Sequence, residues 1–216
     1  MSKQTKLDGM AGIKQGQKTA LGNAQSSTGN LHGVACTIKN YNDPNYAAKL
    51  KALTQGVRIL KDKGYNLPGE MTFHLSSDTT NPKAPTVAYA RKQDNSIGVE
   101  VFLGVNAMFS EPTAMSEGIA HKVHKCALGD YTTTVVVHEL GHVLHDLESH
   151  DFFWGEGDLP LTGGDVGTAF DQISAYAATN KKEVVAEVFA AHNMGLKFSG
   201  SAVSDLYGRC QGPALL

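Results

Sequence analysis

Apolar residues in the first half of the chain are spaced so as to predict one helix followed by three short strands. Residues 46–63 carry an apolar side chain every three or four positions, which places these side chains on one face of a helix that Gly64 ends. The residues of this face are Leu50, Leu53, Val57 and Leu60. Short strands are predicted over residues 71–75, 86–90 and 97–103. In the last of these, apolar residues alternate with other side chains, a pattern typical of a strand with one buried face.

The pattern changes in residues 133–146, where valine and leucine side chains enclose the sequence His138-Glu-Leu-Gly-His142. By propensity alone, residues 132–137 predict a strand, because every residue among them is β-branched. We predict a helix instead, because only in a helix do residues four apart lie one turn apart on the same face, so that both imidazoles point to one spot. Asp130 is a candidate N-cap of this helix.

A second helix is predicted over residues 180–191, and it carries two glutamates among apolar residues. Glu183 and Glu187 lie one turn apart on the same face, bordered by alanines. Buried carboxylates are rare unless they are paired or bound to a metal. Glu183 is therefore predicted as a metal ligand, and Glu187 as the hydrogen-bond partner of a ligating histidine. The alternative for Glu183 is a capping box, with Asn180 as the N-cap.

We expect one folded domain, of the α+β class, over residues 34–216. Residues 1–33 are rich in small and polar residues that cannot form a core face, and they are predicted to be a flexible tail. After the motif helix, three aromatic residues at positions 152–154 precede a stretch rich in glycine and aspartate that ends at Thr168. This stretch is predicted to be a long loop. The aromatic residues either roof a substrate cleft or fill the core.

Composition narrows the possible functions only a little. The chain has 216 residues and a formal net charge of −2, so electrostatic binding to nucleic acid is not expected. No apolar run approaches the ~20 residues that span a bilayer, and no apolar segment of a secretory signal follows the basic N-terminus. The three cysteines lie far apart without a C-x-x-C motif, so neither a disulfide framework nor a cysteine zinc site is expected.

The motif His138-Glu-Leu-Gly-His142 carries the chemistry that we expect of this chain. Two histidines at this spacing can share a zinc ion at about 2.0–2.1 Å from each nitrogen. Glu139 lies to one side of them, so it can hold the attacking water and accept its proton, as in zinc metalloproteases. The expected function is thus metal-assisted hydrolysis, with Glu139 as the base.

A catalytic zinc site takes three protein ligands, so a third ligand must lie elsewhere. His145 lies about 10.5 Å along the helix from His138, which is too far for one metal, and it is expected to be an outer partner or exposed. A histidine six residues after the motif would complete a three-histidine site, but that position is Glu148. Glu183 is the candidate that the sequence favours.

At these residues the chain resembles the catalytic domain of anthrax lethal factor and the related small Pro-Pro endopeptidases. The shared pattern is His138-Glu-Leu-Gly-His142 and, some forty residues on, Tyr176-x-x-Thr-Asn-x-x-Glu183-x-x-Ala-Glu187-x-Phe. The resemblance covers about 60 residues, from 131 to 191.

This resemblance implies a zincin-like fold with a small mixed sheet, an active-site helix and a second helix that carries the third ligand. It assigns the zinc ligands to His138, His142 and Glu183. It also implies that Glu139 is the general base, that Glu187 supports a ligand, and that the phenol of Tyr176 donates to the developing oxyanion.

Two other peptidase families share part of the pattern. The ImmA-like peptidases, which cleave phage repressors, have similar motif helices and a later E-x-x-A-x-x-F-A-A pattern, as in residues 183–191, but Tyr176 is not part of it. The fungal aspzincins carry G-T-x-x-D-x-x-Y-G, and residues 167–171 match the first half. Ser174 stands at the tyrosine position of that pattern, so Asp171 remains only the alternative third ligand.

Two further hypotheses concern the metal itself. A closed site with four protein ligands would indicate a non-catalytic zinc-binding protein. His121 and His124 could form a second site, but their spacing fits no common zinc pattern and the lysines beside them favour a solvated surface. One zinc ion per chain is therefore expected.

The function predicted from these residues is zinc-dependent hydrolysis of peptide bonds in a protein or peptide substrate by a monomeric endopeptidase. Proteins of the resembling family act as secreted toxins or exported proteases. We therefore expect a toxin or effector that is secreted or delivered into a target cell, with a cytoplasmic protein as the alternative.

Overall fold

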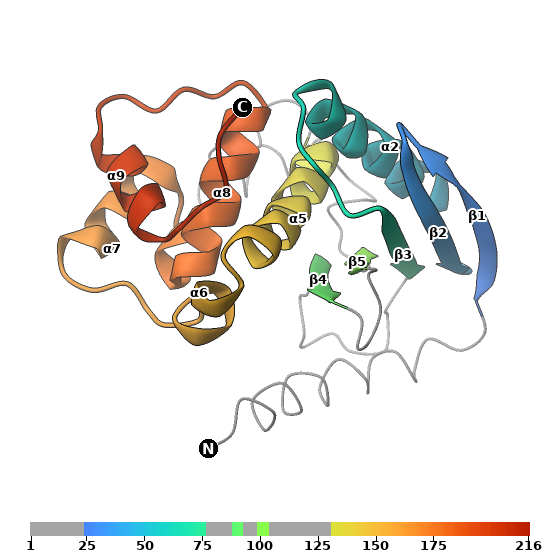
Figure 1. Ribbon diagram of the computed structural model, residues 1–216, viewed down its shortest axis with the longest axis horizontal. Helices are drawn as coiled ribbons and strands as arrows, with labels where there is room; N and C mark the ends of the chain where they lie inside the picture. The colour runs from blue at the N-terminus through green and yellow to red at the C-terminus, as the bar shows by residue number, and fades with distance from the viewer. Residues whose placement is uncertain (1–23, 77–87, 93–98, 104–130) are drawn as a thin grey trace, which may run out of the picture.

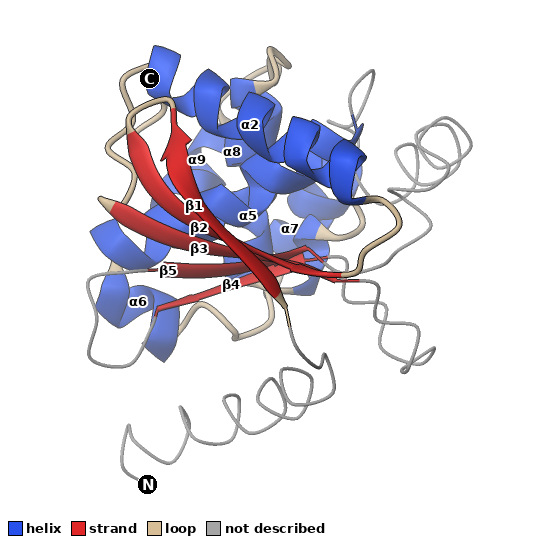
Figure 2. Ribbon diagram, turned by 90° about the vertical axis from the view of Figure 1, so that its right-hand side faces the viewer, coloured by secondary structure: helices blue, strands red, loops and turns tan. Residues whose placement is uncertain are grey.

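Five strands form one mixed sheet in the computed structural model, which describes residues 24–76, 88–92, 99–103 and 131–216. The strand order is β1-β2-β3-β5-β4 (Figure 2). Strands β2, β3 and β5 are parallel to one another, and the outer strands β1 and β4 run antiparallel to their neighbours. The bounds are β1 (Gln25–Leu31), β2 (Val34–Tyr41), β3 (Glu70–Ser76), β4 (Ala88–Lys92) and β5 (Val99–Leu103).

The helices of the described chain lie on one side of this sheet (Figure 2). Helix α5 runs through the middle, with α2 and the sheet on one side of it and α8 on the other (Figure 1). The chain order is α2 (Tyr46–Asp62), α5 (Tyr131–Glu148), α6 (His150–Gly155), α7 (Gly164–Thr168), the π-helical turn η2 (Ala169–Ile173), the 3₁₀ turn η3 (Ala177–Thr179), α8 (Lys181–Asn193) and α9 (Ala202–Arg209). Helix α5 therefore lies between the sheet and α8 (Figure 1).

The core lies between the sheet and helices α2 and α5, and it continues past α5 to α8 and α9. The central strand β3 is buried on both faces, with Met71, Phe73 and Leu75 fully inaccessible. Helix α2 packs against α5 at Gly56, where a Cβ atom would lie 2.8 Å from Cγ1 of Val136. Because such a contact is too short for a side chain, glycine at this position permits the two helices to approach closely.

The α+β class and the mixed sheet predicted from the sequence are confirmed. The helix predicted over residues 46–63 matches α2, and the three predicted strands match β3, β4 and β5 with small shifts at their ends. Residues 131–148 form a helix, so the choice against β-propensity is also confirmed. The candidate cap Asp130 lies outside the described residues.

The predicted boundary of the tail at residue 33 is wrong. Residues 25–31 form β1, which pairs with β2 along its whole length. The strand is exposed almost throughout and shows no apolar alternation, so backbone pairing with β2 holds it in place. The connecting residues His32 and Gly33 both have positive φ, the conformation of a two-residue hairpin turn. Residues 1–23 lie outside the described residues.

The long loop predicted up to Thr168 is only partly correct. The three aromatic residues at positions 152–154 lie within α6, and the short helix α7 occupies Gly164–Thr168. Residues 156–163 form the connection between these helices. No helix in the described part of the chain has the length and apolar character needed to cross a membrane.

Candidate metal centre

Helix α5 presents His138 and His142 on one side, one turn apart. Their ring centroids are 4.8 Å apart, with His138 buried and His142 half-buried. The β-branched residues accept a helical conformation because nearly all side chains from 133 to 146 are buried. Tertiary packing of this kind outweighs the propensities of single residues.

Helix α8 brings Glu183 to these histidines because it packs directly on α5. The contact falls at Gly141, where a Cβ atom would lie 2.9 Å from Cδ1 of Phe189, so a glycine inside the motif permits the approach. The start of α8 is fixed by Asn180, whose side-chain oxygen accepts from the backbone N–H of Glu183 at 3.0 Å. Asn180 is therefore the N-cap of α8, and Glu183 is the third residue of the helix, with its carboxylate turned to the histidines instead of back to the cap.

The three side chains converge on one small volume. Oε2 of Glu183 lies 3.1 Å from Nε2 of His138 and 3.4 Å from Nε2 of His142. One ligand atom from each of these residues lies within 4.8 Å of the others, so the group could hold a metal ion. Oε2 of Glu183 is also buried. A buried carboxylate oxygen in this position fits a cation.

The electrostatics of the group point the same way. Burial would raise the pKa of Glu183, but the charge of His142 and the hydrogen bond from His138 hold it well below its usual range. Burial would lower the pKa of His138, but hydrogen bonds to Glu183 and Glu187 raise it well above its usual range. The carboxylates thus attract positive charge to the imidazoles, and a divalent cation would meet the same attraction.

Glu187 contacts the side of the His138 ring that faces away from Glu183. One of its oxygens, Oε1, lies 2.8 Å from Nδ1 of His138, and the other, Oε2, accepts from the hydroxyl of Ser174 at 2.8 Å. With Nδ1 facing a carboxylate, the imidazole turns Nε2 toward Glu183, the arrangement that orients histidine ligands in metal sites. The supporting role predicted for Glu187 therefore has a matching geometry.

Glu139 and Tyr176 lie beside the same cluster. Glu139 is buried, with 6 % of its surface exposed. The ring of Tyr176 lies 5.9 Å from that of His138, and 37 % of the residue remains exposed. Burial, followed by the negative charges of Glu183, Glu139 and Glu187, raises the pKa of Tyr176 above its usual range. Its phenol therefore stays protonated near neutral pH and can donate a hydrogen bond.

His145 lies in the interior of the protein. It is fully buried, and its ring packs 5.2 Å from that of Phe153 and 5.9 Å from that of Phe152. Burial and then the charge of His142 lower its pKa to about 4, so it is neutral at physiological pH. The prediction of an exposed residue is wrong.

The aromatic residues after the motif helix pack beside the histidines and contribute to the core. Phe153 is buried, and its ring lies 6.2 Å from that of His142. Lys182, next to Glu183 in α8, places its ammonium 4.1 Å from the centre of the Phe153 ring and 2.9 Å from Asp158. This lysine ties the segment after α6 to α8. Sequence reasoning missed it because the partners lie more than twenty residues apart.

Other candidate ligands do not join the cluster. Asp171 is exposed in η2 and is not part of the group of His138, His142 and Glu183. Within residues 24–76 and 131–216, no second group of metal-ligating side chains of this kind is found. His121 and His124 lie outside the described residues, so the second site considered for them stays a hypothesis.

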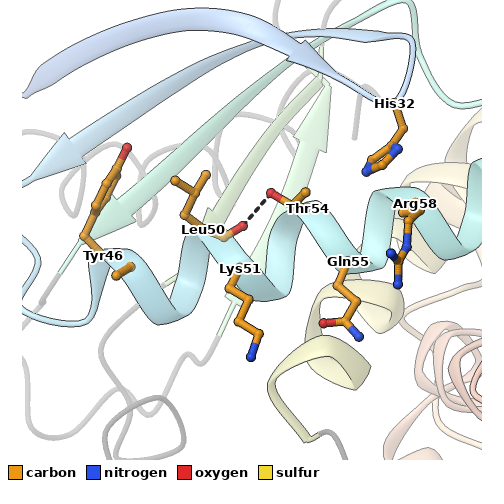
Figure 3. Close-up of a pocket in the computed structure, with 8 residues that line it drawn as sticks. His32, Tyr46, Leu50, Lys51, Thr54, Gln55 and Arg58 are labelled. Carbon is orange, nitrogen blue, oxygen red and sulfur yellow. Dashed lines mark hydrogen bonds between the residues drawn. The ribbon is translucent and has the colours of Figure 1, made fainter.

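A separate hollow of about 470 Å³ lies between α2 and the β1–β2 turn (Figure 3). Figure 3 shows Lys51 and Arg58 on the exposed side of α2, with Leu50 and Thr54 turned toward the sheet and His32 above them. None of His138, His142 and Glu183 lines this hollow.

Comparison of the chain with protein-family models, curated proteins and solved structures finds no match. The argument for a function therefore depends on the cluster of His138, His142 and Glu183 and on the residues around it.

Proposed function

We propose that the chain is a zinc-dependent endopeptidase with a zincin-like fold. The observation that carries this proposal is the convergence of His138, His142 and Glu183 from two helices, with a carboxylate and a phenol beside them. Three protein ligands of the type His₂Glu are found in catalytic zinc sites, whereas structural sites are closed by four. The described residues supply three.

Each side chain has a role that follows from its position. When bound, zinc would polarise the substrate carbonyl and lower the pKa of water from 15.7 toward about 7. Glu139 follows the ligand His138 in the helix, and we infer that it accepts the proton of the attacking water. Tyr176, kept protonated by its surroundings, donates to the oxygen of the tetrahedral intermediate.

The edge of the sheet supports a peptide as substrate. Strand β4 is the last strand in the sheet order, and it lies against α5. One side of β4 therefore has no strand partner among the described residues. An extended peptide could pair with this edge and pass beside the helix that carries the histidines.

The place of Tyr176 favours a lethal-factor-like peptidase over an ImmA-like one, because the tyrosine belongs only to the first pattern. We carry the toxin or effector role as part of this proposal. Its support is the resemblance of the motif residues and the ring contact between Tyr176 and His138.

The proposal is tested by comparing the parent with Glu139→Gln. Zinc content is measured by mass spectrometry of the metal, and cleavage is measured on a library of unbiased peptides. The variant should keep one zinc per chain and cleave about 10²–10⁴-fold more slowly, since it loses a base and not a ligand. A parent that holds zinc but cleaves no peptide would favour the non-catalytic alternative. Loss of zinc from the variant would contradict the role of Glu139.

A further inference from the structure

Ser174 links the metal cluster to the turn that carries Tyr176. It follows η2 directly and is buried, with 1 % of its surface exposed. Its hydroxyl donates to Oε2 of Glu187 at 2.8 Å and accepts from the backbone N–H of Ala177 at 2.9 Å. One hydroxyl thus serves a carboxylate on α8 and the first residue of η3.

The first of these bonds reaches the histidine ligand. Glu187 uses its second oxygen, Oε1, to contact Nδ1 of His138 at 2.8 Å. A carboxylate held at both oxygens cannot rotate freely, so the hydroxyl of Ser174 fixes the plane of the carboxylate that orients His138. Removing the hydroxyl would leave Oε2 of Glu187 buried without this donor.

The second bond reaches the phenol. Ala177 follows Tyr176 directly, and the same turn is closed by Thr179, whose hydroxyl donates to the backbone carbonyl of Tyr176 at 2.8 Å. The bond from Ala177 to Ser174 ties this turn to α8 through Glu187. The turn of Tyr176 and the carboxylate of Glu187 are therefore both held by the hydroxyl of Ser174.

We propose that Ser174 is a positioning residue that holds Glu187, and through it His138, in register with the turn that carries Tyr176. This inference rests on the proposed function, because it assigns Ser174 to the support of that site. The inference goes beyond the proposed function because the hydroxyl of Ser174 touches neither metal nor substrate. It nevertheless sets the positions of both His138 and the turn that carries Tyr176.

The experiment measures zinc affinity by competition with a chelating dye, using the full chain stripped of metal. Ser174→Ala should bind zinc roughly 10–100-fold more weakly, the usual effect of losing an outer partner. With zinc in excess, its kcat should fall while KM changes little. Thr179→Ala is the matched control, since it removes a hydroxyl from the same turn without touching Glu187, and it should bind zinc as tightly as the parent.

A pair of isosteric variants separates the hydroxyl from the packing. Ser174→Thr keeps the hydroxyl, and Ser174→Val has a methyl group in its place. Because the two side chains have nearly the same size, steric strain should affect both variants equally. The threonine variant should bind zinc within a few-fold of the parent and the valine variant at least ten-fold more weakly than the threonine variant. In the double variant of Ser174→Ala with Glu187→Gln, affinity should fall no further than in Glu187→Gln alone.

The outcomes distinguish this inference from the proposed function. If the parent binds no zinc, the proposed function fails and the inference fails with it. If the parent binds zinc and the valine and threonine variants bind it equally, the role of Ser174 is refuted while the metal site stands. Equal losses in Ser174→Ala and Thr179→Ala would likewise assign the effect to the turn and overturn the link through Glu187.

Discussion

The ion pair at the start of α2 and the cluster between α5 and α8 both bury charge, but they balance it differently. At the start of α2, Lys49 forms an ion pair with Asp43, and both side chains are completely buried. Between α5 and α8, the carboxylates of Glu183 and Glu187 lie against the imidazole of His138. The first cluster pairs one cation with one anion. In the second cluster, carboxylates lie beside imidazoles, which are neutral in their usual form.

The difference separates a structural ion pair from a candidate site. A buried pair of opposite charges is already neutral, and its cost of desolvation is offset within the pair. Carboxylates gathered around imidazoles carry excess negative charge, which can be offset by protonating the imidazoles or by binding a cation. Buried charge that is not balanced by its own side chains therefore indicates where a ligand belongs.

The largest effect is expected from Glu183→Ala, which removes the proposed third ligand and part of the excess negative charge. Zinc affinity should fall by more than the roughly 10–100-fold that loss of an outer partner costs, and cleavage should be lost with it. Asp171→Ala removes an exposed carboxylate from the same half of the molecule and is the control. Metal titration decides between them, and a larger loss in Asp171→Ala would favour the aspzincin-like alternative.

Tyr176→Phe should reduce cleavage while leaving metal binding intact. In the proposed mechanism the phenol stabilises charge that develops only in the transition state, so kcat should fall by about 10²–10³ with a smaller change in KM. Steady-state kinetics and zinc content measured on one preparation test this. Near-normal turnover would remove Tyr176 from the reaction and favour the ImmA-like alternative.

Lys49→Met tests the balanced cluster. Removing one partner of a buried pair leaves the other charge uncompensated, so the free energy of unfolding should fall by about 3–5 kcal/mol. Zinc affinity should be unchanged in the folded variant. Lys51→Met, on the exposed side of the same helix, should stay within about 0.5 kcal/mol of the parent. Urea unfolding gives both values, and a stable Lys49→Met protein with weakened zinc binding would contradict the contrast between the two clusters.

His145 provides the smallest effect, because it is buried without charge. Its pKa is lowered by burial to about 4, so below pH 6.5 the unfolded chain takes up a proton that the folded chain does not. Stability should therefore fall as the pH drops from about 6.5 to 4, by up to about 3 kcal/mol. His145→Phe should remove this contribution, whereas His32→Gln, at an exposed histidine, should retain it. Parallel pH curves for the parent and His145→Phe would contradict this account.

The sequence predicted the cluster and the position of Glu187 beside it, but not the part of Ser174 or the burial of His145. Spacing on a helix was enough to associate His138 with His142, and the apolar neighbours of Glu183 indicated that its carboxylate is buried. Ser174 gave no such signal, because a serine before a turn is equally common on surfaces, and only the fold places it under Glu187. The burial of His145 was missed for the same reason, since it depends on α6 folding back over α5.

In the fold, too, elements with a local sequence pattern could be predicted, whereas elements that depend on tertiary pairing could not. Helix α2 follows from its apolar spacing, whereas β1 has no apolar alternation and exists because β2 offers it a full set of backbone partners. The turn at His32 and Gly33 was the available signal, since a glycine-containing two-residue turn typically joins two strands.

The contact between Gly141 and Phe189 has a consequence for sequence variation. Because a Cβ atom at position 141 would lie 2.9 Å from the Phe189 ring, these two positions share a fixed amount of space between α5 and α8. A chain descended from the same ancestor could carry alanine or serine inside the motif only with a smaller residue in place of the phenylalanine. Residue size at the two positions should therefore vary in opposite directions among relatives that keep the histidines and the glutamate, which makes this pair a marker for the spacing of the two helices.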